Sequence, residues 1–220
     1  MRIVASLKKS GNAKYISHLD SLRVLHRSVL RANIPIAYSQ GYSPHPLMSF
    51  ATALALGHTG DGEWIDVKMQ EDIQVNEFIQ KINPCLPTGY EVTNAYAVDD
   101  KFPAVASFMQ SAEYVATTDT IIDFKTLNNA ILSLLSSNII ITKRKKSGNK
   151  KVNAEVDIRP HIYEMKAVEG KFPKLHIVGK LDNTGALNVD ALLAQLNILL
   201  NLDCMWSVNR KSVNLIGFNP

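Results

Sequence analysis

Long apolar runs are scarce in this sequence of 220 residues. The longest nearly apolar stretches, Ser49–Gly57 and Ala191–Leu200, fall well short of the roughly 20 residues that a membrane-spanning helix needs. We therefore expect no membrane span and no membrane partner. The N-terminus alternates like a strand and reaches Lys8 and Lys9 without the apolar segment and cleavage site of a secretory signal. This start is typical of a mature cytoplasmic protein.

Cysteine is also scarce. Cys85 and Cys204 are far apart, and two isolated thiols are too few for a zinc or iron-sulfur site built on clustered cysteines. The pair favours a reducing compartment, with both residues acting as small hydrophobic side chains. We expect this chain to bind no cofactor.

A strong excess of one charge sign is lacking, because the net charge is only +4. That total hides three blocks. Residues 1–46 carry seven basic and one acidic residue, residues 47–100 carry two and nine, and residues 101–220 carry fifteen and ten. The blocks therefore have net charges of +6, −7 and +5. This pattern predicts a surface on which charges of one sign gather on one face.

The composition, with 46% hydrophobic and 20% charged residues, is ordinary for a globular protein. The length allows one large domain or two small ones. Hydrophobic periodicity and turn signals predict a first half of order βαββαβ. Its elements are a strand at 2–8, a helix from the Ser17 cap to about 32, strands at 48–56 and 63–69, a helix at 75–82 and a strand at 90–98.

The second half repeats that order with one strand left over. We expect strands at 113–117, 139–143, 152–158, 163–168, 175–178 and 205–216, with helices at 124–135 and 189–200. The fold class predicted is α+β, with two ferredoxin-like units of antiparallel sheet. The N-terminal unit would span residues 1–103 and the C-terminal unit residues 104–220.

The first predicted helix carries Arg23, Arg27 and Arg31 four residues apart, so the three guanidinium groups lie along one side. Ser17 and Asp20 match a helix start in which a hydroxyl caps backbone N–H groups and an acid follows three residues later. Stacked cations without interleaved Glu indicate an anionic partner such as phosphate. The alternative is a solvated face that takes acids from residues 61–77.

The loop after that helix contains several residues that restrict or determine the shape of its backbone. Tyr38 and Tyr42 offer rings that stack on a base, Gly41 permits close approach of a ligand, and two prolines restrict His45. Either this loop binds a ligand or it packs tightly over the helix. The substrate-binding residues predicted here are Tyr38, Ser39, Gln40, Gly41, Tyr42 and His45, together with Ser17, Asp20 and the three arginines.

His18 and His45 flank the helix and are the candidate catalytic pair. Two imidazoles near Lys8, Lys9 or Lys14 would suffice for acid-base cleavage of a phosphodiester. The alternative is that His18 is simply the residue after the Ser17 helix cap and has no catalytic role. No metal-ligand spacing is present in the sequence, and we assign no metal site.

A basic segment lies between two predicted strands of the second half. Such a hairpin tip reaches phosphate backbones without reading sequence, although lysines at a strand edge also serve to prevent aggregation. Asp157 and Arg159 follow, two residues apart and able to pair. The nucleic-acid-binding residues predicted in this tip are Lys143, Arg144, Lys145, Lys146, Lys150 and Lys151.

These motifs together resemble the bacterial radical SAM-linked protein family, a domain of unknown function found alone or fused to radical SAM enzymes. The match is dense over residues 8–68 and weaker afterwards. The residues that carry it are 14–20, Arg23, Arg27, Arg31, Pro35, 38–46, 49–51, Leu54, 56–57, Glu63 and Asp66.

The resemblance implies an association with a radical SAM enzyme. This chain lacks the three-cysteine motif, so the iron-sulfur cluster and S-adenosylmethionine are expected only in that partner. Our leading hypothesis is a non-catalytic accessory module that holds an anionic substrate, RNA above all. The alternatives are a nuclease-like RNA-processing enzyme that uses His18 and His45, and a protein-interaction adaptor without nucleic-acid binding.

Overall fold

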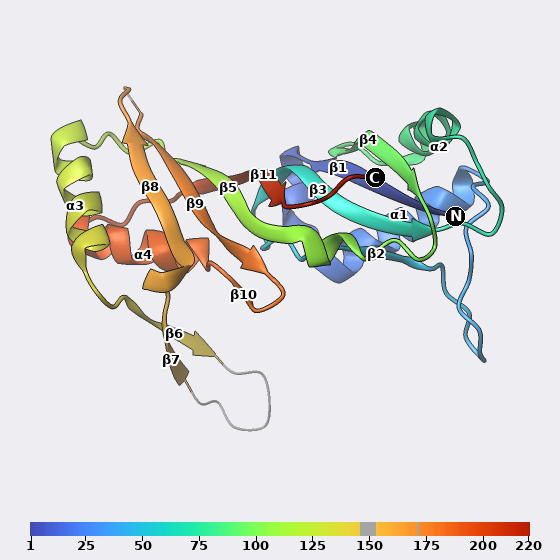
Figure 1. Ribbon diagram of the computed structural model, residues 1–220. Helices are drawn as coiled ribbons and strands as arrows, with labels where there is room; N and C mark the ends of the chain where they lie inside the picture. The colour runs from blue at the N-terminus through green and yellow to red at the C-terminus, as the bar shows by residue number, and fades with distance from the viewer. Residues whose placement is uncertain (146–152, 171) are drawn as a thin grey trace. The chain divides into compact units, whose positions relative to one another are not determined.

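The computed structural model describes residues 1–145, 153–170 and 172–220, and of residues 143–145, 153 and 154 it describes the backbone alone. Over these residues the protein is a mixed α+β structure with four α-helices and mostly antiparallel strands (Figure 1). It divides into unit 1, Met1–Gln110 with Asn209–Pro220, and unit 2, Ser111–Val208. The sequence analysis placed a single boundary at residue 103 and did not foresee that the C-terminal segment belongs to unit 1.

Unit 1 follows the predicted order βαββαβ. β1 pairs antiparallel with both β3 and β4, and β2 pairs antiparallel with β3. Whether the unit is ferredoxin-like in the strict sense stays a prediction. Its elements are β1 (Arg2–Lys9), α1 (His18–Arg31), β2 (Met48–Phe50), β3 (Thr59–Lys68), α2 (Val75–Ile82) and β4 (Tyr90–Val98), joined by the end of β11 (Ser207–Leu215).

The two faces of this sheet are covered differently. Alternate residues of a strand point to opposite faces, and Ile3, Ala5 and Leu7 of β1 are fully buried in one core with side chains of α1 and α2. On the opposite face lies an aromatic cluster of half-buried rings. It contains Trp64, Tyr96, Phe102, Phe108 and Phe218, with ring centroids 5.3 to 6.3 Å apart.

The predictions for β2 and β3 are corrected by the structure. β2 ends at Phe50 instead of residue 56, and β3 begins at Thr59 instead of residue 63. Thr59 and Gly60 pair in parallel with Asn209 and Arg210 of β11. A pairing between residues 150 positions apart leaves no local signal in the sequence.

Unit 2 contains most of β5 (Met109–Thr117), then α3, two hairpins and α4. β9 pairs antiparallel with β5, β8 and β10, and α3 packs against α4 and β8. The core contains Leu127 and Ile131 of α3 and Leu192 and Leu196 of α4. The further bounds are α3 (Phe124–Ser136), β6 (Ile141–Lys145), β7 (Asn153–Asp157), β8 (Ile162–Val168), β9 (Lys174–Asp182), β10 (Gly185–Ala186) and α4 (Val189–Leu200).

The predicted basic hairpin exists, but it stands outside the larger sheet. In the described part of the chain, β6 and β7 pair only with each other. Lys143, Arg144 and Lys145 lie in β6, whereas Lys146, Lys150 and Lys151 of the predicted tip lie outside the described residues.

The expected pairing of Asp157 with Arg159 takes another form. The Asp157 carboxylate accepts from the backbone N–H groups of Ile140 and Arg159, which holds its pKa below the ordinary value. The Arg159 guanidinium donates instead to the carbonyl oxygens of Leu135 and Ile162. Both side chains therefore fasten backbone at the base of the hairpin.

Candidate functional site

The start of α1 is a closed polar network. Ser17 caps the helix by accepting from the backbone N–H of Asp20 at 3.2 Å, as predicted. The hydroxyl of Ser17 donates to the Asp20 carboxylate at 2.7 Å, and Arg23 donates to the same carboxylate at 2.7 Å. These two bonds, the Ser17 bond first, lower the pKa of Asp20. Asp20 thus neutralises the first arginine of the predicted stripe.

The three arginines of α1 have different surroundings. Arg31 donates to the carbonyl of Cys85 at 2.6 Å and to Ser28 at 3.1 Å, so it joins α1 to the segment after α2. Arg27 is exposed, and among the described residues no carboxylate lies within salt-bridge distance of it. Arg27 is therefore the cation of the stripe that is most available to an external anion.

The segment from Tyr38 to Pro46 is a hairpin-like loop that extends from the body of unit 1 (the light-blue loop before β2 in Figure 1). Tyr38 bridges Pro46 across its base. Ser39 and His45 are joined by three bonds: Ser39 N–H to the His45 carbonyl at 2.9 Å, His45 N–H to the Ser39 hydroxyl at 3.1 Å, and that hydroxyl to His45 Nδ1 at 2.9 Å. The base of the loop is thus well held.

The tip of this loop is open to solvent. Gln40, Gly41 and Tyr42 are exposed, and Tyr42 is fully so. Gly41 has a φ of 132°, which L side chains rarely adopt, so the tip needs glycine there. A tyrosine ring presented on a well-held, projecting loop is available for stacking on a ligand.

Among the described residues, no contact between His18 and His45 is present. The His18 ring packs against Phe50 with centroids 5.3 Å apart, whereas His45 is bonded to Ser39 at the base of the loop. That the two histidines form a catalytic pair stays a prediction.

His26 of α1 is a partly buried titratable residue near the candidate site that the sequence did not single out. Burial above all, and then the nearby His45, lower its pKa, while a bond to the backbone of Met48 opposes the shift. Within the described part of the chain, its buried Nε2 has no hydrogen-bond partner. Its place near the apolar stripe of α1 made it resemble an ordinary core position.

A cavity of about 330 Å³ opens beside the loop base. His45 is the one predicted site residue that lines it. The rest of the lining comes from the chain leading into β2 and from the two neighbouring strands: Arg2, Pro46, Leu47, Met48, Ser49, Asp66 and Lys68. The sequence could not indicate this set, because it depends on β1, β2 and β3 lying side by side.

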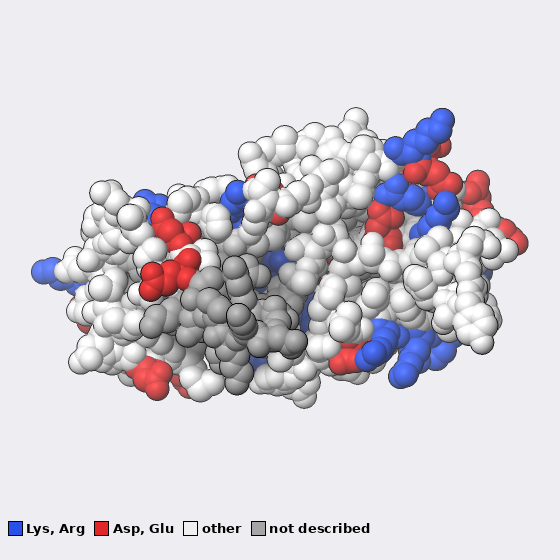
Figure 2. Space-filling view, turned by 90° about the horizontal axis from the view of Figure 1, so that it is seen from below, with Lys and Arg blue, Asp and Glu red and all other residues white. Residues whose placement is uncertain are grey.

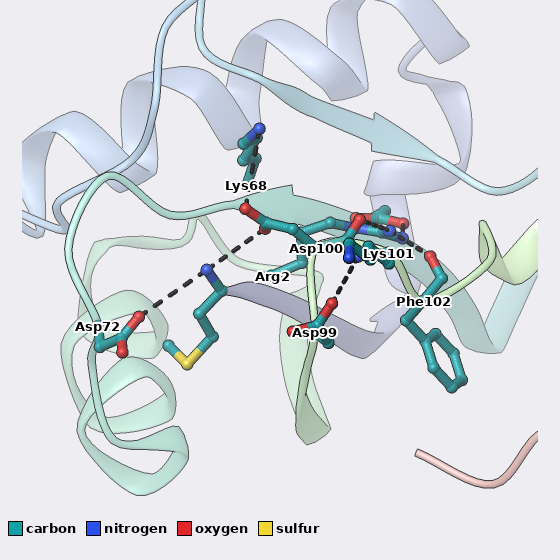
Figure 3. A network of polar contacts seen from close by, with 9 residues as sticks. Arg2, Lys68, Asp72, Asp99, Asp100, Lys101 and Phe102 are labelled. Carbon is teal, nitrogen blue, oxygen red and sulfur yellow. Dashed lines mark hydrogen bonds and ion pairs between the residues drawn. The ribbon is translucent and has the colours of Figure 1, made fainter.

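Arg2 is among the residues that line that cavity. It is held by several partners (Figure 3). It donates through Nε to Asp66 at 2.9 Å, makes a second bond to the same carboxylate, and donates to the carbonyls of Phe102 and Asp100. The Asp66 bond is the main reason that the pKa of Arg2 is raised. Among the described residues, Lys68 is within salt-bridge distance of Asp100 alone, at 4.0 Å.

Glu63, another residue of the family-like motif, is a structural anchor. It forms a buried ion pair with Arg210 of β11, in which Arg210 Nε donates at 2.8 Å, and both side chains are about 2% exposed. A Cβ at Gly60 would lie 2.4 Å from Glu63 Oε1, so glycine makes room for the carboxylate. Lys9, also buried, donates to the Ile16 carbonyl at 2.7 Å, and burial lowers its pKa.

The charge on the surface is unevenly spread. Figure 2 shows one compact group of Lys and Arg side chains with few acids, and a second place where basic and acidic side chains mix. Among the described residues, no group of three or more His, Cys, Asp or Glu side chains is arranged to hold a metal ion. No helix in the described ranges is both long and apolar enough to cross a membrane.

Comparison with solved structures identifies the general fold. A chain of the crystal structure of a Cbf5-Nop10-Gar1 complex matches with a TM-score of 0.52 and 11% identity. The match covers 96% of this chain and 48% of that chain, so this chain spans about half the length of its structural neighbour. A crystal structure of an unknown protein from Galdieria sulphuraria matches over 94% and 97% of the two chains at 11% identity, with a TM-score of only 0.27.

The family follows from the sequence itself. Residues 2–191 match the family described as "Uncharacterized protein conserved in bacteria (DUF2344)". The chain belongs to this family. No protein with a curated description matches the sequence.

Proposed function

We propose that this protein is an RNA-binding accessory module that holds its substrate for a radical SAM enzyme. The observation that carries the proposal is the projecting loop with the fully exposed ring of Tyr42 at its tip, on the same unit as the exposed cation Arg27, which has no carboxylate within salt-bridge distance among the described residues. Aromatic rings stack on single-stranded bases, and arginine binds phosphate. Proteins that bind single-stranded RNA combine aromatic side chains, which stack on bases, with basic side chains, which bind the phosphate backbone.

The well-held loop base supports this proposal. Exposing a tyrosine ring forgoes the stabilisation that burial would provide, which is of the order of 1.5–3 kcal/mol for a large apolar side chain. The three bonds between Ser39 and His45 limit the motion of the loop, so little ordering would be required when a base stacks on Tyr42.

Binding of an unstructured RNA over a series of salt concentrations tests the proposal. We expect affinity that falls steeply with salt, a reduction of about fivefold or more in Tyr42→Ala, and a shallower salt dependence in Arg27→Gln. Lys125→Gln on α3 is the control for Arg27 and should bind like the parent. Absence of binding at low salt, or affinity independent of salt, would show that the module does not bind RNA.

A surface for the partner enzyme is supported by exposed apolar side chains near the start of α1. Tyr15, Leu19 and Leu56 are each about two-thirds exposed, and the Gly57 N–H donates to the Lys14 carbonyl at 2.8 Å, which joins their two segments. Apolar side chains grouped on a surface are typical of protein contacts. The radical SAM partner itself comes from the family resemblance.

Co-purification with the radical SAM enzyme encoded by the same genome tests that surface. Leu19→Glu should reduce recovery of the enzyme, while Leu132→Glu, at an exposed position of α3, should not. Equal recovery with both variants would remove this surface as the docking site.

The nuclease alternative also has a direct test. Labelled RNA should remain intact with the parent protein if the module only binds. Cleavage that disappears in a His18→Ala, His45→Ala double variant would instead favour the enzyme hypothesis.

A further inference from the structure

The cavity beside the loop base has the size and lining of a site for one nucleotide. Its volume of about 330 Å³ lies at the lower end of the range of small-molecule sites, roughly 300–1,000 Å³. Three of its lining residues, Pro46, Leu47 and Met48, are apolar. All lining residues belong to unit 1, and His45 connects the cavity to the proposed RNA-binding loop.

The polar lining favours an anion. Asp66 is the only carboxylate among the lining residues, and Arg2 neutralises it through two bonds. The remaining charged group is Lys68, whose ammonium is half-exposed and lies 4.0 Å from Asp100, too far for a strong hydrogen bond. Ser49 adds a hydroxyl, which can donate to an anion beside Lys68.

His45 completes the polar lining. Its Nδ1 is engaged by the Ser39 hydroxyl at 2.9 Å, and no bond to the second ring nitrogen, Nε2, is present among the described residues. The bonds that hold the loop therefore also orient the imidazole beside the cavity. A ring N–H at Nε2 would donate to a phosphoryl oxygen.

A terminal phosphate fits these features better than an internal linkage. A phosphate monoester carries a charge of about −1.5 to −2 at neutral pH, whereas each internal phosphodiester carries a single charge. A concave site of one-nucleotide size also accepts the end of a chain more easily than its middle. We infer that this cavity binds the terminal phosphate of an RNA substrate, with Lys68 and His45 as its ligands; the inference refines the proposed function and rests on it.

Fluorescence anisotropy with three versions of one short RNA tests the inference. One version carries a 5′-phosphate, one a 3′-phosphate and one only hydroxyl ends. We expect one phosphorylated version to bind about tenfold more tightly than the hydroxyl-ended RNA, the size expected for charge-assisted bonds. Lys68→Gln should abolish that preference and leave binding of the hydroxyl-ended RNA nearly unchanged.

Lys81→Gln on α2 is the matched control. Lys81 is 42% exposed against 48% for Lys68, and it too has one carboxylate neighbour, but it lies outside the cavity. The control should retain the full preference. His45→Gln provides a second variant of the lining, and thermal unfolding of all three variants verifies that they fold.

The outcomes separate this inference from the proposed function. Equal binding of all three RNAs would overturn the terminal-phosphate site and leave RNA binding intact. A preference that survives both Lys68→Gln and His45→Gln would show that the phosphate binds elsewhere. If no RNA binds but adenosine monophosphate binds in a Lys68-dependent manner, more tightly than inorganic phosphate, the cavity is a mononucleotide site and the proposed function is wrong.

Discussion

At the scale of single residues, the carboxylates of the family-like motif hold the fold together. Asp66 binds Arg2, and Glu63 binds Arg210 from a distant part of the chain. Both carboxylates entered the sequence analysis only as residues that carry the family resemblance, and residue type and motif membership do not distinguish an anchor from a ligand. The distinction depends on which cation the folded chain brings to each carboxylate.

The buried pair of Glu63 and Arg210 should be costly to break from one side. Glu63→Gln removes the charge of the carboxylate that pairs with the buried Arg210, and we expect a loss of about 3–5 kcal/mol in the free energy of unfolding. Urea denaturation measures it. Glu77→Gln, which removes an exposed i,i+4 pair with Lys81, is the control and should cost about 0.5 kcal/mol or less. Similar losses in both variants would contradict the anchoring role.

His26 should make stability depend on pH. Its pKa in the folded chain is below the ordinary value of 6.5, so below that pH the unfolded chain binds the proton more readily. The stabilisation is complete above about pH 6.5 and is lost as the pH falls through the lowered pKa. Thermal midpoints across this range should fall in the parent and vary less in His26→Gln. His176→Gln on β9 should retain the parental slope; a slope unchanged in His26→Gln would assign the effect to another group.

At the scale of elements, the sequence predicted an element well where its signals lie within the element itself, such as a capping residue and an apolar period. α1 runs from His18 to Arg31 with its cap at Ser17, close to the range predicted from its apolar period and capping pattern. The helix ends with Asn33 at a φ of 49°, a conformation that asparagine tolerates. The boundaries of β2 and β3 were wrong, because those strands are defined by pairing with distant segments.

The cap of α1 predicts a measurable coupling between stability and ionisation. Ser17→Ala should cost about 1 kcal/mol, the usual value for loss of an N-cap. It should also raise the pKa of Asp20, because the Ser17 hydroxyl is the largest cause of the lowered value. Denaturation and NMR titration of the Asp20 carboxyl measure the two effects. Ser43→Ala in the exposed loop should change neither; an unshifted Asp20 in Ser17→Ala would refute the network.

At the scale of the whole molecule, the C-terminal segment returns to unit 1. Arg210 pairs with Glu63, and Phe218 packs against Trp64 with ring centroids 5.3 Å apart. Unit 1 is therefore built from two distant parts of the sequence. A division of the chain at residue 103 would separate the sheet from the residues that cover its second face.

Phe218 should contribute to the stability of unit 1, although most of that unit is formed by residues 1–110. Phe218→Ala removes a ring that contacts four others, and we expect a loss of about 1–3 kcal/mol with a red shift of the tryptophan emission. Ile216→Ala, two residues earlier at an exposed position, should cost little. An unchanged unfolding transition in Phe218→Ala would show that the segment does not stabilise unit 1.

The sequence by itself determined the α+β class, the order of elements in unit 1, the capped basic helix and the presence of a loop after it. These features follow from periodicity, capping and turn chemistry, which act between residues close in the sequence. Only the tertiary structure decided that Arg31 is bonded to the Cys85 carbonyl, that the His18 ring packs against Phe50, and that Arg2, His45 and Lys68 line one cavity. These outcomes depend on strand register and on contacts between distant segments, and neither is written in the local pattern of residues.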